Sequence, residues 1–213
     1  MKKSPEELLE HIVFLYQKYS HEMRATTQPY YLEQLRKHDS NYEYHPEHDV
    51  VRESLLEHVG VLPMLAIEFY PYIDDEQVDL GRALTMLAIH DIGELIVGDV
   101  STFKKDTSDY SQEQQAALSL LDSSYHEIYK EAESKQTHTA KFAKSIDKIA
   151  PDILDYVTDA VDTRYRFNVL YKKEPNEIVP LIVEHKRPHM LWNPFMTTFH
   201  DLLMSKVSEK LVG

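Results

Sequence analysis

An imidazole and a carboxylate interrupt a stretch of sequence that should otherwise be apolar. In residues 87–100, LAIHDIGELIVGDV, the pair His90-Asp91 lies between runs of leucine, isoleucine and alanine. Burying both groups costs several kcal/mol unless another group compensates. Hydrogen bonds within the core would compensate, and so would a bound divalent cation. The sequence therefore leaves two roles open for the His90-Asp91 pair: a hydrogen-bonded pair in the core, or ligands of a metal ion.

Two further ionisable side chains fall on or beside inward faces of expected helices. His58 lies on the apolar stripe of a helix expected over residues 50–70, between two leucines on the same face. Asp147 lies among small alanines in a helix expected over 138–150, where neighbouring helices can approach closely. A single histidine on such a face is more often a hydrogen-bonded core residue. A metal site is indicated only because His58, the His90-Asp91 pair and Asp147 occur together in one chain. Two imidazoles and two carboxylates make a nitrogen and oxygen ligand set for one divalent metal, with positions left for water and substrate.

The elements that must position these groups are predicted to be helices throughout. The chain has only 5 glycines against 14 tyrosines, and apolar residues recur at helical spacing. A first helix is expected to begin at Ser4-Pro5. Further helices are expected over 50–70, 78–97, 112–133, 138–150 and 152–171, with loops over 38–49 and 98–112. A last helical segment is interrupted by Pro188 and Pro194.

Composition narrows the class of protein. A chain of 213 residues suits a single domain with a real core. The formal net charge of -13 argues against duplex nucleic acid as a partner, while a small phosphorylated ligand remains compatible with a local pocket. The absence of cysteine excludes disulfides, thiolate zinc sites and cysteine nucleophiles. No signal peptide or membrane span is expected, so a cytoplasmic location without membrane contact is predicted, and a homodimer stays open.

The ordered set of His, His-Asp and Asp resembles the HD-domain phosphohydrolases. RESLLEH (52–58) looks like the first-histidine segment of that family. HDIGELIVGD (90–99) is similar to the HD-x-x-E-x-x-x-G-D pattern of its 5′-deoxynucleotidase-like branch. EQQA (113–116) and THTAKFAKSIDKI (137–149) resemble the segments that follow in that branch. The similarity spans about residues 50–155.

The resemblance implies an all-α HD-domain helical bundle with a metal site in its core. The metal ligands would be His58, His90, Asp91 and Asp147, holding one divalent cation among Mn, Co, Fe, Ni, Mg and Zn. Glu94 would orient or deprotonate the attacking water, although an ordinary buried salt bridge is its alternative role. Asp99 would face the nucleotide, although a turn aspartate is equally expected on local grounds.

The phosphate contacts are less well defined by the sequence. The branch carries an arginine, often beside a tryptophan, before the first histidine segment, and here the only tryptophan is Trp192. Arg36 and Arg52 are the candidates that remain, and Lys104 and Lys105 follow Asp99 in a loop. Two other histidines, at 126 and 138, are expected on the surface, which favours one metal.

The expected reaction is hydrolysis of a phosphomonoester, with a deoxyribonucleoside 5′-monophosphate as the preferred substrate. An HD phosphohydrolase acting on another nucleotide or on a signalling phosphodiester is one alternative. A metal-stabilised helical module that only binds a nucleotide or a partner protein is the other. The motif indicates metal-dependent phosphate chemistry more firmly than it indicates this substrate.

Overall fold

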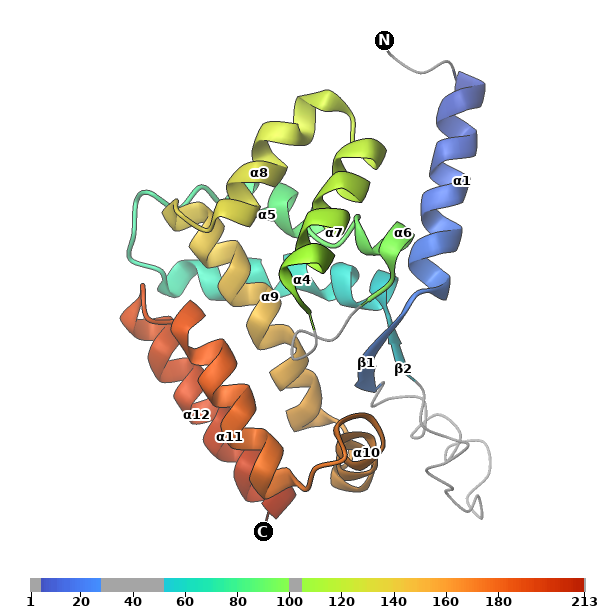
Figure 1. Ribbon diagram of the computed structural model, residues 1–213. Coiled ribbons are helices and arrows are strands. Elements are labelled where there is room, and N and C mark those ends of the chain that lie inside the picture. Colours follow the sequence, from blue (N-terminus) through green and yellow to red (C-terminus); the bar gives the residue numbers. More distant parts are fainter. Residues whose placement is uncertain (1–4, 28–51, 100–104, 213) are drawn as a thin grey trace, which may run out of the picture.

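The computed structural model describes residues 5–27, 52–99 and 105–212, and these residues are almost entirely helical (Figure 1). This confirms the all-α prediction. The helices are α1 (Pro5–His21), α4 (Leu55–Phe69), α5 (Leu80–Ile89), α6 (Glu94–Val97), α7 (Thr107–Leu120), α8 (His126–Ser134), α9 (His138–Val157), α10 (Ala160–Arg166), α11 (Pro175–Lys186) and α12 (Pro194–Val212). Short helical turns are η1 (Tyr70–Tyr72), η2 (Ser123–Tyr125), η3 (Phe167–Tyr171) and η4 (Arg187–His189).

Helix α9 is the central element, and it packs against α4, α5, α8 and α12. Its predicted apolar stripe, Phe142, Ile146 and Ile149, is fully buried in the main hydrophobic cluster. The sequence predicted that one helix would end at residue 150 and another would begin at 152, and this is wrong. The helix runs through Pro151 to Val157 because residues on both sides of the proline pack against the same core.

The predicted helix over 78–97 is interrupted at the residues that include the His90-Asp91 pair. Helix α5 ends at Ile89, residues 90–93 form tight turns, and α6 is only four residues long. Backbone bonds from Ile92 N to Ile89 O and from Glu94 N to Asp91 O, at 3.2 and 3.0 Å, replace the regular helical ladder. Apolar spacing continues across the break, so periodicity alone could not reveal it.

The segment expected as one helix over 112–133 is divided into α7, η2 and α8. Helix α7 begins inside the stretch predicted to be a loop, because the Asp106 carboxylate accepts from the backbone N–H groups of Ser108 and Asp109. Asp122 caps η2 in the same way. The predicted loop at 38–49 and Ser4 lie outside the described residues, whereas α1 begins at Pro5 as expected.

Two short strands, β1 (Met23–Thr27) and β2 (Arg52–Ser54), form an antiparallel pair that the sequence did not predict. Met23 pairs with Ser54 and Thr27 pairs with Arg52. The pair joins the end of α1 to the start of α4, as Figure 1 shows. It therefore places a segment near the N-terminus beside the helix that carries His58.

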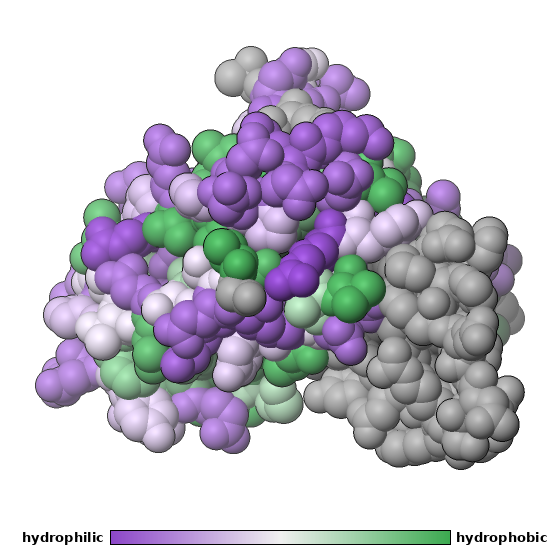
Figure 2. Space-filling model, turned by 90° about the horizontal axis from the view of Figure 1, so that it is seen from below, coloured by the Kyte–Doolittle hydropathy of each residue, from purple (hydrophilic) through white to green (hydrophobic). Residues whose placement is uncertain are grey.

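The C-terminal part forms a pair of packed helices, α11 and α12, separated by η4 (Figure 1). Pro188 lies in η4 and Pro194 begins α12, so both prolines interrupt the helical segment as predicted. The face seen from below carries its hydrophobic residues in small separate patches among hydrophilic ones (Figure 2). Within the described ranges, no helix is both long enough and apolar enough to cross a membrane.

Candidate metal centre

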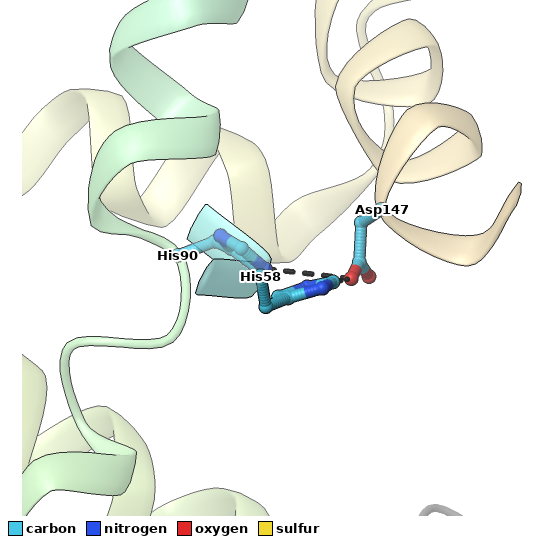
Figure 3. A group of neighbouring side chains, drawn as sticks. All are labelled: His58, His90 and Asp147. Carbon is cyan, nitrogen blue, oxygen red and sulfur yellow. Dashed lines mark hydrogen bonds and ion pairs between the residues drawn. The ribbon is translucent and has the colours of Figure 1, made fainter. Parts of the chain in front are cut away.

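Three of the four predicted ligands meet in the core with their polar atoms facing one another (Figure 3). Asp147 Oδ1 lies 3.3 Å from His58 Nε2 and 3.4 Å from His90 Nε2. The three side chains come from α4, from the turn after α5 and from α9, and each offers an atom within 4.8 Å of the others. All three are buried. The helical bundle therefore assembles a compact group of potential ligands from distant parts of the sequence.

Asp91 borders the same point from the other side. Its Oδ1 lies 3.0 Å from His90 Nε2, and its Oδ2 lies 3.7 Å from His58 Nε2. The same Oδ2 accepts a hydrogen bond from Arg24 Nη1 at 2.8 Å. The fourth predicted ligand is thus in place, and an arginine neutralises part of its charge.

The orientation of both imidazoles fits metal coordination. His90 Nδ1–H donates to the carbonyl oxygen of Leu87 at 2.9 Å, which leaves Nε2 to face the cluster. His58 Nδ1 lies 3.8 Å from the buried carboxylate of Glu53, on the side away from Asp147. Within the described part of the chain, His90 Nε2 is buried and makes no hydrogen bond of good geometry, so its contacts with the Asp91 and Asp147 carboxylates are ion pairs. Nitrogen and oxygen donors of this kind suit a divalent cation, so the residues present fit one.

The charges around the cluster favour a bound cation. Although burial disfavours the imidazolium, the carboxylates of Asp91 and Asp147 raise the pKa of His90 to about 10. Burial and the Arg24 charge lower the pKa of His58 to about 4. Against the effect of burial, the Lys144 ammonium helps to hold the pKa of Asp147 well below its usual range. His90 therefore carries the proton that a cation would displace.

Glu94 begins α6 and is buried beside Asp91. Its Oε1 lies 3.5 Å from Lys105 Nζ, and its Oε2 lies 3.9 Å from Arg24 Nη1. Burial, followed by the charges of Asp91 and Asp99, raises the pKa of Glu94 well above its usual range. His90 and Glu94 both lie in the stretch expected as one helix over 78–97, whereas the structure has a tight turn at 90–93 that brings Glu94 to the site.

A cavity of about 240 Å³ opens beside the cluster. It is lined by Arg24, His90, Asp91, Glu94, Asp99, Lys105, Tyr110, Glu113, Glu133, Lys135, Lys144, Asp147, Lys148, His185 and His189. Asp99 reaches it because Gly98 adopts a φ of 83°, in the left-handed region that favours glycine. The Asp99 backbone N–H donates to Glu22 Oε1 at 3.2 Å, and burial raises the pKa of its carboxyl group.

Of the predicted phosphate-binding residues that the structure describes, one lines the cavity and the other contacts the backbone of β1. Lys105 lines the cavity, forms an ion pair with Glu113 and lies over the ring of Tyr110. Arg52 does not line it. Its guanidinium is exposed and donates to the backbone carbonyl oxygens of Met23 and Arg24, at 2.7 and 2.5 Å, and so supports β1. Arg36 and Lys104 lie outside the described residues.

Arg24 is the site residue that the sequence reasoning missed. Its side chain is 15% exposed and lies within 4 Å of the carboxylates of Glu53, Asp91 and Glu94. It reaches them because β1 pairs with β2, and that pairing was not predicted. The available signal was an arginine upstream of the first histidine segment, but Arg24 has no tryptophan beside it, and Arg36 and Arg52 lie nearer to that segment.

Gly93 brings α7 against the turn that carries His90 and Asp91. A Cβ atom at Gly93 would lie 2.3 Å from the Glu113 carbonyl oxygen, so only glycine allows this approach. Carboxylate oxygens of Asp91, Glu94 and Glu113 consequently lie within 4.8 Å of one another. Burial raises the pKa of Glu113, and the Lys105 ammonium beside it limits the repulsion.

His126 and His138 take no part in this cluster. Both are partly exposed, and the side chain of His138 is 35% exposed. His126 Nε2–H donates to the carbonyl oxygen of Leu121 at 3.2 Å, and His138 forms an ion pair with Asp75. Neither therefore adds to the group of potential ligands around Asp147.

Comparisons with known proteins agree with this arrangement. The HD domain family model matches residues 43–183, and the chain belongs to the HD domain family. The fold is similar to a predicted metal-dependent phosphohydrolase from Magnetospirillum magnetotacticum MS-1, with 20% identity and a TM-score of 0.68 over 95% of this chain and 94% of that one. It is also similar to a conserved hypothetical protein from Pyrococcus furiosus, with 20% identity and a TM-score of 0.55 over 84% of this chain and 99% of that one. No curated protein matches the sequence.

Proposed function

We propose that the protein is a metal-dependent phosphohydrolase that releases phosphate from phosphomonoesters, with deoxyribonucleoside 5′-monophosphates as its substrates. The observation that carries the proposal is the buried group of His58, His90 and Asp147, with Asp91 beside it, in the wall of a polar cavity. Membership of the HD domain family and the similarity of the fold to the predicted metal-dependent phosphohydrolase from Magnetospirillum support the same chemistry.

The ligand set proposed for one divalent cation is His58, His90, Asp91 and Asp147. When bound, such a cation lowers the pKa of water and offsets charge on a phosphate group. Glu94 is proposed to take a proton from the attacking water, since its carboxyl group is buried beside Asp91 and its raised pKa makes the ionised carboxylate a stronger base. In the balanced reaction the water oxygen bonds to phosphorus and the bond from phosphorus to the ester oxygen breaks. The proton held at Glu94 is then available to the leaving oxygen.

Three further cavity residues, Arg24, Lys105 and Asp99, are proposed to bind different parts of the substrate. Arg24 can donate to a phosphate oxygen while it keeps its contact with Asp91. Lys105 supplies a second positive charge on the same side of the cavity. Asp99 is proposed to accept a hydrogen bond from the 3′-hydroxyl of the sugar. These groups offer donors to a phosphate and an acceptor to a sugar hydroxyl, which are the groups that a small phosphorylated nucleotide carries.

A phosphate-release screen with added Mn²⁺, Co²⁺, Ni²⁺, Fe²⁺, Mg²⁺ or Zn²⁺ tests the proposal. The substrates are deoxyribonucleoside and ribonucleoside monophosphates, nucleoside triphosphates, cyclic dinucleotides and p-nitrophenyl phosphate. We expect release from deoxyribonucleoside monophosphates by the wild-type protein and none by Asp147→Asn. Turnover confined to another class of substrate would support the phosphohydrolase activity and contradict the proposed nucleotide substrate. Metal-induced stabilisation without any turnover would instead indicate a binding module.

A further inference from the structure

Glu22 lies between α1 and β1 and is hydrogen-bonded to three separate segments of the described chain. Its backbone N–H donates to the carbonyl oxygen of Lys18 at 3.0 Å, at the end of α1. Its carbonyl oxygen accepts from the N–H of Leu55, the first residue of α4, at 3.0 Å. Its side-chain Oε1 accepts from the N–H of Asp99 at 3.2 Å. The backbone of Glu22 is thus held on both sides, and its carboxylate extends from a fixed point toward Asp99.

The chain changes direction immediately before Asp99. Helix α6, which packs against α1, ends at Val97, and Gly98 follows with a φ of 83° (Figure 1). Glycine restricts the backbone less than any other residue, so this turn does not by itself fix the residue that follows it. A Cβ atom at Gly98 would lie 3.6 Å from Glu22 Oε1. The Glu22 carboxylate therefore lies against the turn and is also bonded to the residue beyond it.

Asp99 depends on this contact for its position. Among the described residues, the bond to Glu22 is the only hydrogen bond that Asp99 makes. Its side chain lines the cavity, whereas Glu22 is not among the residues that line it. Because one backbone hydrogen bond holds Asp99 after a glycine turn, loss of that bond would release its carboxylate from its place in the cavity.

The same short segment also carries Arg24, two positions after Glu22. Arg24 Nη1 donates to Asp91 Oδ2 at 2.8 Å, beside the metal cluster. Burial raises the pKa of Asp99, and the Arg24 guanidinium opposes that rise, so the two charged groups interact. Residues 22–24 therefore act at two places in one cavity. Arg24 lies where the phosphate is proposed to bind, and Glu22 holds the residue that is proposed to bind the sugar.

We propose that Glu22 is a positioning residue, which fixes the Asp99 carboxylate at the place where the sugar of the substrate binds. This inference rests on the proposed function, in which Asp99 accepts a hydrogen bond from the 3′-hydroxyl. Glu22 acts through the N–H of Asp99 and does not touch the substrate. It distinguishes nucleotides from small phosphate esters, because only a nucleotide has the sugar that Asp99 recognises.

The test measures binding by calorimetry, with Mn²⁺ present, of two ligands that cannot be hydrolysed. One is the phosphonate analogue of dAMP, in which a carbon atom replaces the 5′ ester oxygen. The other is methylphosphonate, which has neither sugar nor base. Glu22→Ala removes the acceptor for the Asp99 N–H, whereas Glu22→Gln keeps a side-chain oxygen that can accept from it. Glu22→Asp keeps the charge but shortens the side chain by one carbon, which withdraws the acceptor.

Glu177→Ala is the matched control. Glu177 Oε2 also accepts from a backbone N–H, that of Glu174 at 3.0 Å, but Glu177 is exposed and is not among the residues that line the cavity. Asp99→Ala and the double variant with Glu22→Ala and Asp99→Ala complete the set. Thermal unfolding shows whether each variant is folded. If Glu22→Ala does not fold, Glu22→Asp takes its place.

We expect the wild-type protein, Glu22→Gln and Glu177→Ala to bind the nucleotide analogue about tenfold more tightly than methylphosphonate, the scale of one hydrogen bond to a charged group. This ratio should fall toward one in Glu22→Ala, while the affinity for methylphosphonate stays the same. Asp99→Ala should lower the ratio to the same extent. The double variant should lower it no further, because both changes remove the same interaction.

A purely structural role for Glu22 would weaken both ligands equally or add to the loss caused by Asp99→Ala, and either result would overturn the inference. So would an unchanged ratio in the folded Glu22 variants, or a wild-type protein that binds neither ligand or does not prefer the nucleotide analogue. Phosphate release is measured separately. The expected ratios without turnover of any substrate would support the positioning role and contradict the hydrolase. Turnover of nucleotides with ratios unchanged in the Glu22 variants would support the hydrolase and contradict the positioning role.

Discussion

Arg24 Nη1 lies 2.8 Å from Asp91 Oδ2, although 67 positions separate these residues in the sequence. Burial disfavours the guanidinium charge, but the carboxylates of Asp91, Asp99 and Glu94 raise the pKa of Arg24 further above its usual range. The guanidinium is thus the fixed positive charge of a strongly acidic group of side chains. The short strand β1 is consequently part of the site rather than a connection to it.

Replacing Arg24 with glutamine should destabilise the metal-free protein more than the metal-loaded protein. The change leaves Asp91 and Glu94 without their cation, and a bound divalent ion would restore part of that charge. Thermal unfolding with and without Mn²⁺ measures the difference. Arg82→Gln is the control, since Arg82 pairs with Glu131 and is 38% exposed. An equal loss with and without metal would show that Arg24 supports only the packing of β1.

The purified protein should hold about one divalent cation per chain after metal supplementation and desalting. Asp91→Ala should remove it, because this carboxylate borders both histidines at the cluster. Elemental analysis gives the stoichiometry. Asp201→Ala, which removes an exposed partner of Arg187, should keep the metal. A wild-type protein that retains no metal under any of these conditions would contradict the whole proposal.

Glu94→Gln should separate binding of the metal from use of the water. Glutamine preserves the shape of the side chain and removes its ability to accept a proton, so kcat should fall by about 10²-fold or more while metal content is unchanged. Steady-state kinetics and elemental analysis on the same preparation provide the two readouts. Normal turnover by this variant would assign Glu94 to its contacts with Lys105 and Arg24 alone.

Asp99→Ala should weaken the use of nucleotides far more than the use of a generic aryl phosphate. Asp99 is proposed to contact the sugar, which p-nitrophenyl phosphate lacks. The measurement is kcat/KM for dAMP, AMP and p-nitrophenyl phosphate in wild type and variant, and wild type should prefer dAMP to AMP. Equal losses on all three substrates would place Asp99 in support of the fold. Equal wild-type rates on dAMP and AMP would remove the deoxy preference.

The stability of the protein should fall as the pH decreases from about 6.5 to about 4, in part because of His189. Burial and the charges of Lys148, Lys144 and Lys135 lower its folded pKa from 6.5 to about 4. Between these values the unfolded chain binds a proton that the folded protein does not, so the free energy of unfolding decreases as the pH falls. Denaturant unfolding at several pH values should give a shallower decrease for His189→Gln. An identical pH dependence in wild type and variant would contradict the lowered pKa.

The parts of the site that lie on regular helices could be predicted from the sequence. His58 occupies a place in an apolar stripe that a buried side chain must fill, and Asp147 lies among alanines in α9. Both patterns are local, since they follow from the spacing of a single helix. The all-helical fold could be predicted for the same reason.

The remaining parts depend on contacts between distant segments. Arg24 reaches Asp91 only because β1 and β2 pair, and strands of this length carry almost no signal of their own. The turn at 90–93 depends on the close approach between Gly93 and Glu113. His189 reaches the cavity because η4 packs against α9. Periodicity within one segment cannot reveal any of these three contacts.

The position of β1 and η4 outside the family match has a practical consequence for work on shortened chains. The HD domain match covers residues 43–183, whereas Arg24 and His189 fall on either side of that interval. A fragment trimmed to the match would keep every proposed metal ligand and could still be recognised as an HD domain. It would nevertheless lack a cavity residue from each flank, so a loss of selectivity in such a fragment would reflect the choice of its boundaries rather than the chemistry of the intact protein.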